Sequence, residues 1–270
     1  MLAIYQYFSY NLPIKDRFKM IRAAGFDAVG LWRDDWFGIT GHRGYADMAR
    51  SAGLEITDGH APFIRDFDFV NAIWLDNLSG EQTYETYRNT IIGCGEDGLK
   101  NLIIHITDDY HGRTVPPVST VGIERFKCLT GIAENNDVTI ALENISINSY
   151  QAYVFEHVNS PNLGFCYDSG HKNCFEPGAD ILSLFGEKIV AVHLHDNDSS
   201  EDQHRIPFEG SIDWRDQMSA IARTGYGGAT TLECTAGPPG SIEPNDTRSA
   251  EEWLRTAFEA AKKLDALRWC

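Results

Sequence analysis

VTIALEN (138–144) and LGFCYDS (163–169) are short, largely apolar runs bounded by Gly, Asn or Pro, and both are predicted to be β-strands. Six further runs share this character: LAIYQ (2–6), DAVGLW (27–32), LEITDGH (54–60), NLIIHIT (101–107), IVAVHLHD (189–196) and ATTLECT (229–235). Apolar runs of this length suit strands that are buried on both faces of a parallel sheet. We therefore expect eight strands along the chain.

Longer amphipathic stretches with helical periodicity separate these runs. Four of them are IKDRFKMIRAAG (14–25), TVGIERFKCLTGIAENN (120–136), DWRDQMSAIARTG (213–225) and SAEEWLRTAFEAAKKLDAL (249–267). The first and the third end in Gly, as helices often do. Strands that alternate with helices indicate βαβ units around a parallel sheet. We expect an α/β protein with a single domain over residues 1–270, a closed (β/α)8 TIM barrel.

An open, doubly wound parallel sheet is the competing fold, because it uses the same alternation of strands and helices. That fold would favour a glycine-rich phosphate loop directly after the first strand. The segment YFSYNLP (7–13) in this place contains no glycine. No linker or low-complexity run divides the chain, so the closed barrel is the favoured prediction.

The composition favours small-molecule chemistry. The chain has 23 basic and 39 acidic residues, a formal net charge of −16, and its long-range field therefore repels polyanions such as nucleic acid. Its six cysteines form no C-x-x-C pair and are expected to be free thiols. The N-terminus lacks the pattern of a signal peptide, and no stretch is apolar enough for a membrane span, so a cytoplasmic location is expected. A homo-oligomer is left open.

Residue types that bind metals stand at the ends of six consecutive predicted strands. In chain order they are His60, His105, Glu143, Asp168 with His171 after it, His193, and Glu233. The C-terminal strand ends of a TIM barrel converge at one mouth, where active sites form. A carboxylate beside apolar runs such as TIAL and ATTL is costly to bury unless a cation compensates it. We therefore predict a divalent ion, and oxygen and imidazole ligands suit manganese, zinc, cobalt or magnesium.

The segment after the seventh predicted strand, HLHDNDSSEDQHRIPFEGSIDW (193–214), is rich in similar residues. Alternation along a strand puts His193 and His195 on the same face, so periodicity alone does not decide which of them binds metal. Asp202 and His204 form a D-x-H pair. This pair is either a second metal motif or a hydrogen-bonded pair within a solvated loop.

Several of these motifs resemble the xylose isomerase-like barrel superfamily, which groups sugar isomerases and epimerases, inosose dehydratases and the apurinic endonuclease IV family. The motifs are ALEN (141–144), YDSGH (167–171), VHLHDND (192–198) with DQHRIPFEGSIDW (202–214), and TLEC (231–234). Similarity to ketose 3-epimerases implies that Glu143, Asp168, His193 and Glu233 hold the metal and that His171 contacts substrate. The resemblance also favours His193 over His195, because family members carry the ligand as the first residue of an H-x-x-D segment.

The endonuclease-like branch of this superfamily uses three zinc ions, and its remaining ligand positions resemble His60, His105, His171, Asp202 and His204. All nine positions of that cluster therefore have a matching residue, and more than one ion is an open expectation. The acidic charge and the shortage of basic residues in the mouth loops argue against nucleic acid as a partner. The loops WRDDWFGITGH (32–42) and APFIRDFDFVNAIWLDN (61–77) look suited to covering a small polar ligand.

The expected function is that of a divalent-metal-dependent sugar or sugar-phosphate isomerase or epimerase. Such an enzyme removes a proton from carbon next to a carbonyl, and the metal stabilises the resulting enediolate as a Lewis acid. Glu143 and Glu233 are the expected acid/base pair. The residues expected to bind a sugar or polyol are His171, His60, His105, Trp32 and Arg205. A polynuclear-zinc phosphodiesterase of the endonuclease IV type and an inosose dehydratase-like lyase are the alternatives.

Aromatic and basic residues of the loops offer further contacts with a sugar. Two fates are open for Trp32, Trp36, Phe63 and Trp74, namely stacking on a sugar ring or packing in the core. Arg113, Lys172 and Arg205 are possible contacts for a phosphate or hydroxyl group of the substrate. The alternative is that these basic side chains are only solvated.

Overall fold

The computed structural model describes residues 1–270 except 34–43, 64–67, 110–113, 239–240 and 269–270. Its strands are β1 (Leu2–Tyr5), β2 (Ala28–Trp32), β3 (Glu55–His60), β4 (Asn101–Ile104), β5 (Thr139–Glu143), β6 (Leu163–Asp168), β7 (Ile189–His193) and β8 (Thr230–Leu232). They form an 8-stranded sheet in the order β7-β6-β5-β4-β3-β2-β1-β8, and each neighbouring pair is parallel.

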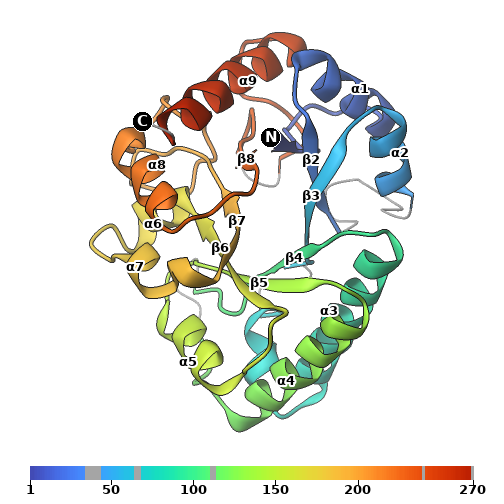
Figure 1. The fold of residues 1–270 in the computed structure, drawn as a ribbon, viewed down its shortest axis with the longest axis vertical. Helices are drawn as coiled ribbons and strands as arrows, with labels where there is room; N and C mark the ends of the chain where they lie inside the picture. Colours follow the sequence, from blue (N-terminus) through green and yellow to red (C-terminus); the bar gives the residue numbers. More distant parts are fainter. Residues whose placement is uncertain (34–43, 64–67, 110–113, 239–240, 269–270) are drawn as a thin grey trace.

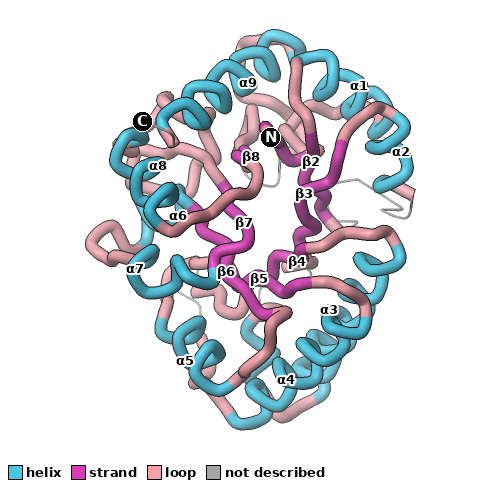
Figure 2. The backbone as a smooth tube through the Cα atoms, in the orientation of Figure 1, coloured by secondary structure: helices cyan, strands magenta, loops and turns pink. Residues whose placement is uncertain are grey.

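Backbone hydrogen bonds next to β7 and β8 close this sheet into a ring. The Leu194 amide donates to the Thr231 carbonyl at 2.9 Å, and the Glu233 amide donates to the Leu194 carbonyl at 3.2 Å. Figure 2 shows the strands around the centre of the molecule and the helices outside them. The predicted (β/α)8 barrel is confirmed, and the open sheet is excluded because the strand order runs continuously around the barrel.

The helices of the described parts of the chain surround the strands (Figure 1). They are α1 (Ile14–Ala24), α2 (Tyr45–Ser51), η1 (Asn71–Trp74), α3 (Leu78–Glu96), α4 (Thr120–Asn135), α5 (Ser149–His157), α6 (Ser169–Phe175), α7 (Ile181–Phe185), η3 (Gly186–Lys188), α8 (Trp214–Arg223) and α9 (Ala250–Leu267). The local sequence explains several ends. Gly25 ends α1 with a φ of 115°, which glycine adopts without strain, and Ser249 begins α9 in a capping box with Glu252. Among these helices we find none with the length and hydrophobicity to cross a membrane.

The strands have two differently packed faces. Outward residues such as Leu142, Phe165 and Val192 join the large apolar core under the helices. Inward residues at the lower levels of the barrel are mostly small; they form two separate clusters, which are Ile103, Ala141, Cys166 and Ala191, and Ala3, Ala28 and Ala229. Because strand side chains alternate between the faces, Glu143 lies on the same inward face as Ala141, one level higher. The strand-end residues therefore form the upper layer of the barrel interior.

Three strands end three residues earlier than the sequence predicted, and β1, β5 and β6 end one residue earlier. The structure ends β4 at Ile104, β7 at His193 and β8 at Leu232, whereas the predicted strands were 101–107, 189–196 and 229–235. After β7 and β8, the following backbone groups pair with a loop. Asp196 exchanges two 2.8 Å hydrogen bonds with Arg205, and the Thr235 amide donates to the His204 carbonyl at 2.8 Å. This folding back brings the segment with Asp202 and His204 over the barrel mouth. The five cysteines in the described residues are free thiols, as predicted, and Cys270 lies outside these residues.

Candidate metal centre

Glu143, the last residue of β5, lies at the centre of the barrel mouth and contacts three histidines. Its side chain is fully buried, and its Oε1 lies 2.9 Å from Nδ1 of His193. Its Oε2 lies 2.9 Å from Nε2 of His105 and 3.3 Å from Nε2 of His60. Burial alone would raise the pKa of Glu143, but His193, His105 and His60 hold it well below its usual range. The carboxylate therefore places a negative charge at the centre of the site.

Asp168 and Glu233 bring two more buried carboxylates to the same place. Glu233 directly follows β8, and its Oε2 lies 2.9 Å from Nδ1 of His193. Burial raises the pKa of Glu233, yet His193 outweighs this and lowers it to about 2. Asp168 ends β6 and caps α6, because its Oδ1 accepts the His171 amide at 2.6 Å. Its buried Oδ2 accepts no hydrogen bond from the residues that the structure describes.

These residues fit a divalent cation. Glu143, Asp168, His193 and Glu233 each offer one ligand atom, and all four atoms lie within 4.8 Å of one another. A carboxylate oxygen that is buried without a partner is costly, and a cation would remove this cost. Carboxylate oxygens with imidazole suit manganese, zinc, cobalt or magnesium, in line with the residue types alone.

Polar side chains fix the strand ends that carry the carboxylates. The Asp168 amide donates to Oδ1 of Asn144 at 2.8 Å, and Nδ2 of Asn144 returns a 2.9 Å bond to the Asp168 carbonyl. Nε2 of Gln151 donates to the Glu143 carbonyl at 2.6 Å. Asn144 thus joins β5 to β6, and Gln151 joins β5 to α5. Outer contacts of this kind orient metal ligands.

Three histidines are oriented by backbone carbonyls. Nδ1 of His60 lies 2.8 Å from the Ala61 carbonyl, Nδ1 of His171 lies 2.9 Å from that of Asn144, and Nδ1 of His204 lies 2.6 Å from that of Glu233. A carbonyl only accepts hydrogen bonds, so each Nδ1 carries the hydrogen. Nε2 of each ring is left to face the cluster, which is how proteins commonly present histidine to a metal.

A second group of possible ligands adjoins the first. His171, His195, Asp202 and His204 each offer an atom within 4.8 Å of the others. Oδ2 of Asp202 lies 2.9 Å from Nε2 of His204 and 3.4 Å from Nε2 of His171. The residues of the D-x-H pair therefore contact each other and also His171, across the mouth. A third group, His60, Glu143 and His193, shares two members with the first, and His105 contacts Glu143.

His195 belongs to this second group, although the sequence analysis favoured only His193 as a ligand. Its ring is fully buried and stacks on His204 with a centroid distance of 3.9 Å. Its Nε2 lies 3.1 Å from Oδ1 of Asp168, and neither ring nitrogen has a hydrogen-bond partner within the described parts of the chain. The signal that could have found it was the shared face with His193. The structure thus brings all nine candidate ligands together and adds His195 to them.

Asp196 is a residue of the site that the sequence analysis did not single out. Its fully buried carboxylate accepts the Phe208 amide at 2.9 Å, the Ile212 amide at 3.2 Å and the Trp214 indole at 2.7 Å. Gly210 passes so close that a Cβ there would lie 2.2 Å from Oδ1 of Asp196. Asp196 therefore holds the loop that carries Asp202 and His204. Its position in an acidic run gave no sign that this carboxylate is buried.

Two aromatic residues flank the histidines. The Trp32 ring lies over His60 with a centroid distance of 4.2 Å, and the Phe63 ring lies 4.8 Å from that of His105. Trp74 instead packs in the core, where its Nε1 donates to the Ile106 carbonyl at 2.7 Å and its ring contacts Phe126. Stacking on a sugar or packing in the core was left open for these residues, and Trp74 packs in the core. Trp36 lies outside the described residues.

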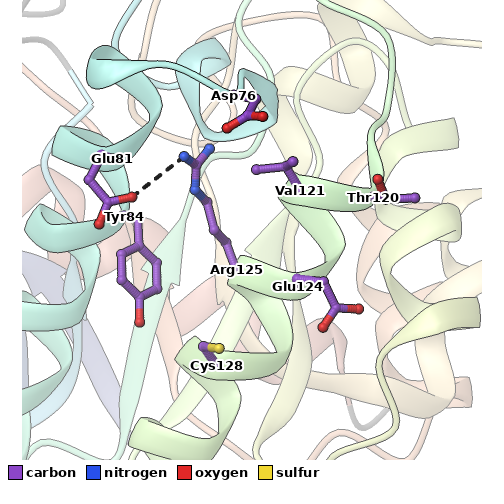
Figure 3. A pocket seen from close by; sticks show the side chains of 8 residues that line it. All are labelled: Asp76, Glu81, Tyr84, Thr120, Val121, Glu124, Arg125 and Cys128. Atoms are coloured by element: carbon purple, nitrogen blue, oxygen red, sulfur yellow. Dashed lines mark ion pairs between the residues drawn. The ribbon is translucent and has the colours of Figure 1, made fainter.

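The basic residues considered for substrate have partners on the surface. Arg205 pairs with Asp198 at 3.0 Å, and Lys172 donates to the Pro177 carbonyl at 2.9 Å. Arg113 lies outside the described residues. A cavity of about 460 Å³ opens elsewhere, between α3 and α4. Figure 3 shows Arg125 and Glu81 facing each other in it, and Nη2 of Arg125 lies 3.7 Å from Oε2 of Glu81. Its lining contains none of the candidate ligands, so it is separate from the barrel mouth.

Known proteins are similar to this chain in sequence. The chain is 32% identical over 154 residues to an uncharacterized protein of Sinorhizobium fredii, a match that spans 53% of this chain and 49% of that protein. A match with an uncharacterized protein of Methanocaldococcus jannaschii spans 62% of that relative. Fructoselysine 3-epimerase of Shigella flexneri is 24% identical over 244 residues, which are 83% of this chain and 86% of that enzyme.

Solved structures agree on the fold. A crystal structure of D-psicose 3-epimerase in the presence of D-fructose superimposes with a TM-score of 0.78 at 13% identity, covering 99% of both chains. The IOLI protein with a bound zinc atom superimposes with a TM-score of 0.73 at 18% identity, covering 98% of both chains. The sequence model of the xylose isomerase-like TIM barrel family matches residues 18–257. Because this match covers most of the chain, the protein belongs to the xylose isomerase-like TIM barrel family.

Proposed function

We propose that the protein is a divalent-metal-dependent isomerase or epimerase of a sugar or sugar phosphate. The observation that carries this proposal is the convergence of Glu143 and Glu233, which come from β5 and β8 and both lie 2.9 Å from Nδ1 of His193. Proton transfer at carbon next to a carbonyl needs such carboxylates beside a stabilising charge. The names of the relatives support this reading, since fructoselysine 3-epimerase and D-psicose 3-epimerase act on sugars.

Glu143, Asp168, His193 and Glu233 would hold the cation. When bound there, a divalent ion would supply Lewis-acid stabilisation of the negative charge that develops on the oxygens of the substrate. The unpartnered Oδ2 of Asp168 supports this assignment from the structure. The IOLI protein, whose structure superimposes with a TM-score of 0.73, binds zinc, which also supports a metal in this protein.

The protein groups divide the proton transfer between them. In an epimerisation, either Glu143 or Glu233 takes the proton from one face of the carbon, and the other glutamate returns a proton to the opposite face. In an aldose–ketose isomerisation, one glutamate suffices, because it returns the proton to the neighbouring carbon. His171, His60 and His105 present Nε2 toward the same space and would orient hydroxyl groups. Trp32, which lies over His60, would cover the sugar ring.

A polynuclear hydrolase is the second candidate, and the second ligand group favours it. His171, His195, Asp202 and His204 could hold a further ion beside the first. Adjacent metal ions serve phosphodiester hydrolysis well. The net charge of −16 counts against a nucleic-acid substrate, because a protein with this charge repels polyanions. A lyase of the inosose dehydratase type would use the same metal and one of the two glutamates.

One preparation tests these alternatives. Protein purified without chelator is analysed for metal content and then incubated in deuterated water with a panel of ketoses, ketose phosphates and inososes. Metal-dependent deuterium incorporation at carbon next to the carbonyl supports the proposal. The same preparation is assayed for nicking of abasic DNA. Nicking with several zinc ions per chain and no exchange into any sugar would contradict it, and loss of water from an inosose would assign the lyase.

A further inference from the structure

Tyr5, Asp58 and His193 form a hydrogen-bonded chain below the candidate metal centre. Tyr5 is on β1, Asp58 on β3 and His193 on β7, and their exposed fractions are 1%, 2% and 0%. The Tyr5 hydroxyl donates to Oδ1 of Asp58, and its oxygen lies 3.0 Å from Nε2 of His193. These two hydrogen bonds therefore connect three separated strands through the barrel interior.

The hydrogen bonds in this chain have a defined direction. A tyrosine hydroxyl has one hydrogen, and the Asp58 carboxylate accepts it. The Tyr5 oxygen can then only accept from His193, so Nε2 of His193 carries a hydrogen. Nδ1 is consequently the atom that faces Glu143 and Glu233, at 2.9 Å from each. This is the reverse of His60, His171 and His204, which face the cluster with Nε2.

The neighbouring strands make room for this arrangement. Gly30 on β2 pairs with Tyr5 in the sheet register, and a Cβ at Gly30 would lie 2.6 Å from the Tyr5 ring. The ring occupies the volume that a side chain at position 30 would fill. The register between β2 and β3 shifts next to Asp58, because Val29 pairs with Ile56 and Leu31 pairs with Gly59. Bulges of this kind change the direction of nearby side chains, here that of Asp58. On the other side, the Tyr5 ring contacts the His193 ring edge-on, with a centroid distance of 5.1 Å.

We propose that Tyr5 and Asp58 are positioning residues that fix the His193 ring with Nδ1 toward the metal and Nε2–H toward Tyr5. This inference rests on the proposed metal centre. Asp58 makes its hydrogen-bond contact through Tyr5: its carboxylate accepts the Tyr5 hydrogen, which leaves the Tyr5 oxygen to accept from His193. Outer partners of metal-bound histidine are commonly worth about 10- to 100-fold in metal affinity.

Zinc titration of the metal-free protein by calorimetry tests the proposal, with Tyr5→Phe, Tyr5→Phe/Asp58→Asn and Tyr167→Phe as variants. Tyr5→Phe alone leaves the Asp58 carboxylate buried without its donor, which could destabilise the protein. The double variant removes this charge as well, so that the loss of the Tyr5 hydroxyl can still be measured. Tyr167→Phe is the matched control, because it also removes a buried hydroxyl, whose hydrogen bond goes to Gln217 of α8. We expect Tyr5→Phe to weaken zinc binding at least about tenfold and the double variant to be no weaker than Tyr5→Phe. The control should stay within about threefold of the wild type.

A spectroscopic readout separates positioning from general loosening of the barrel. In zinc-loaded protein with ¹⁵N-labelled histidine, the His193 ring should show a slowly exchanging Nε2–H and a metal-bound Nδ1. This signal should disappear or exchange rapidly in Tyr5→Phe and persist in Tyr167→Phe. If the wild type binds zinc and Tyr5→Phe binds it as tightly, with the same His193 signal, the positioning role is wrong and the metal centre stands. If the wild type itself binds no divalent ion, the proposed metal centre is wrong, and the positioning role that rests on it is wrong as well.

Discussion

The Nδ1 atom of His193 lies 2.9 Å from Oε1 of Glu143, although the two residues end strands β7 and β5 with β6 between them. Neither side chain is exposed to solvent. In the absence of metal, the pair is an ion pair. Burial alone would lower the pKa of His193, but the Glu233 and Glu143 carboxylates outweigh this and hold it well above its usual range. A divalent cation would take the place of the proton on Nδ1. Metal binding and proton release at this site are therefore coupled.

Glu143→Gln and Glu233→Gln should fold and lose activity on the true substrate by about a hundredfold or more, because each removes a proton-transferring carboxylate. The fold should survive, since the large apolar core lies between the strands and the helices. Steady-state turnover and thermal unfolding measure the two effects separately. Glu259→Gln, an exposed glutamate of α9 that pairs with Lys262, is the control. Near-normal turnover in either active-site variant would refute the two-carboxylate mechanism.

His193→Asn should lose the central ion, whereas His195→Asn should retain it. His193 belongs to the group with Glu143, Asp168 and Glu233, and His195 belongs to the group with Asp202. Metal content per chain after dialysis against a trace of zinc distinguishes the two variants. Where the wild type binds more than one ion, His195→Asn should lose the additional ion only. Loss of the central ion from His195→Asn, with retention in His193→Asn, would reverse the assignment.

The sequence predicted the barrel and most of the mouth for a simple physical reason. Apolar runs that end in Glu143 or Asp168 reveal both a buried strand and the residue at its C-terminal end. The role of Tyr5 could not be read in this way, because LAIYQ looks like any apolar strand and its partners stand on β3 and β7. The burial of Asp196 in an acidic run also depends on where a long loop folds back. Such contacts between distant segments leave no local periodicity.

Gly170→Ala should damage the second ligand group selectively. A Cβ at Gly170 would lie 1.9 Å from Cε1 of His195, so the imidazole must move. Overpacking of this kind costs about 1–3 kcal/mol in the free energy of unfolding. Gly131→Ala in α4 is the control, because nothing lies within 4 Å of the added carbon and alanine favours helix. Chemical denaturation and metal content measure the effects. A Gly170→Ala protein with unchanged stability and full metal content would contradict the packing described for His195.

The metal-free protein should be most stable in mildly acidic solution. Burial alone would lower the pKa of His204, but Asp202 raises it to about 9, so its contribution to stability is complete below about pH 6.5 and is lost as the pH rises through 9. The pKa of Glu233 is lowered to about 2, where burial is outweighed by His193, so its contribution is present above about pH 4.5 and is lost as the pH falls through 2. Both contributions are complete between about pH 4.5 and 6.5.

Divalent metal should reverse the alkaline trend, because the histidines must release protons to bind it. Thermal unfolding in chelator and in excess manganese or zinc, measured from acidic to alkaline pH, checks both statements. The gain in Tm on adding metal should grow from about pH 5.5 to about pH 8. His204→Asn is the companion variant, because it should flatten the decline of the metal-free protein above about pH 6.5. It should also weaken the acidic limb, since His204 helps to lower the pKa values of Glu233 and Asp202. A metal-free protein whose Tm rises between about pH 6.5 and 9 would show that these histidines are not held protonated by the carboxylates of the mouth.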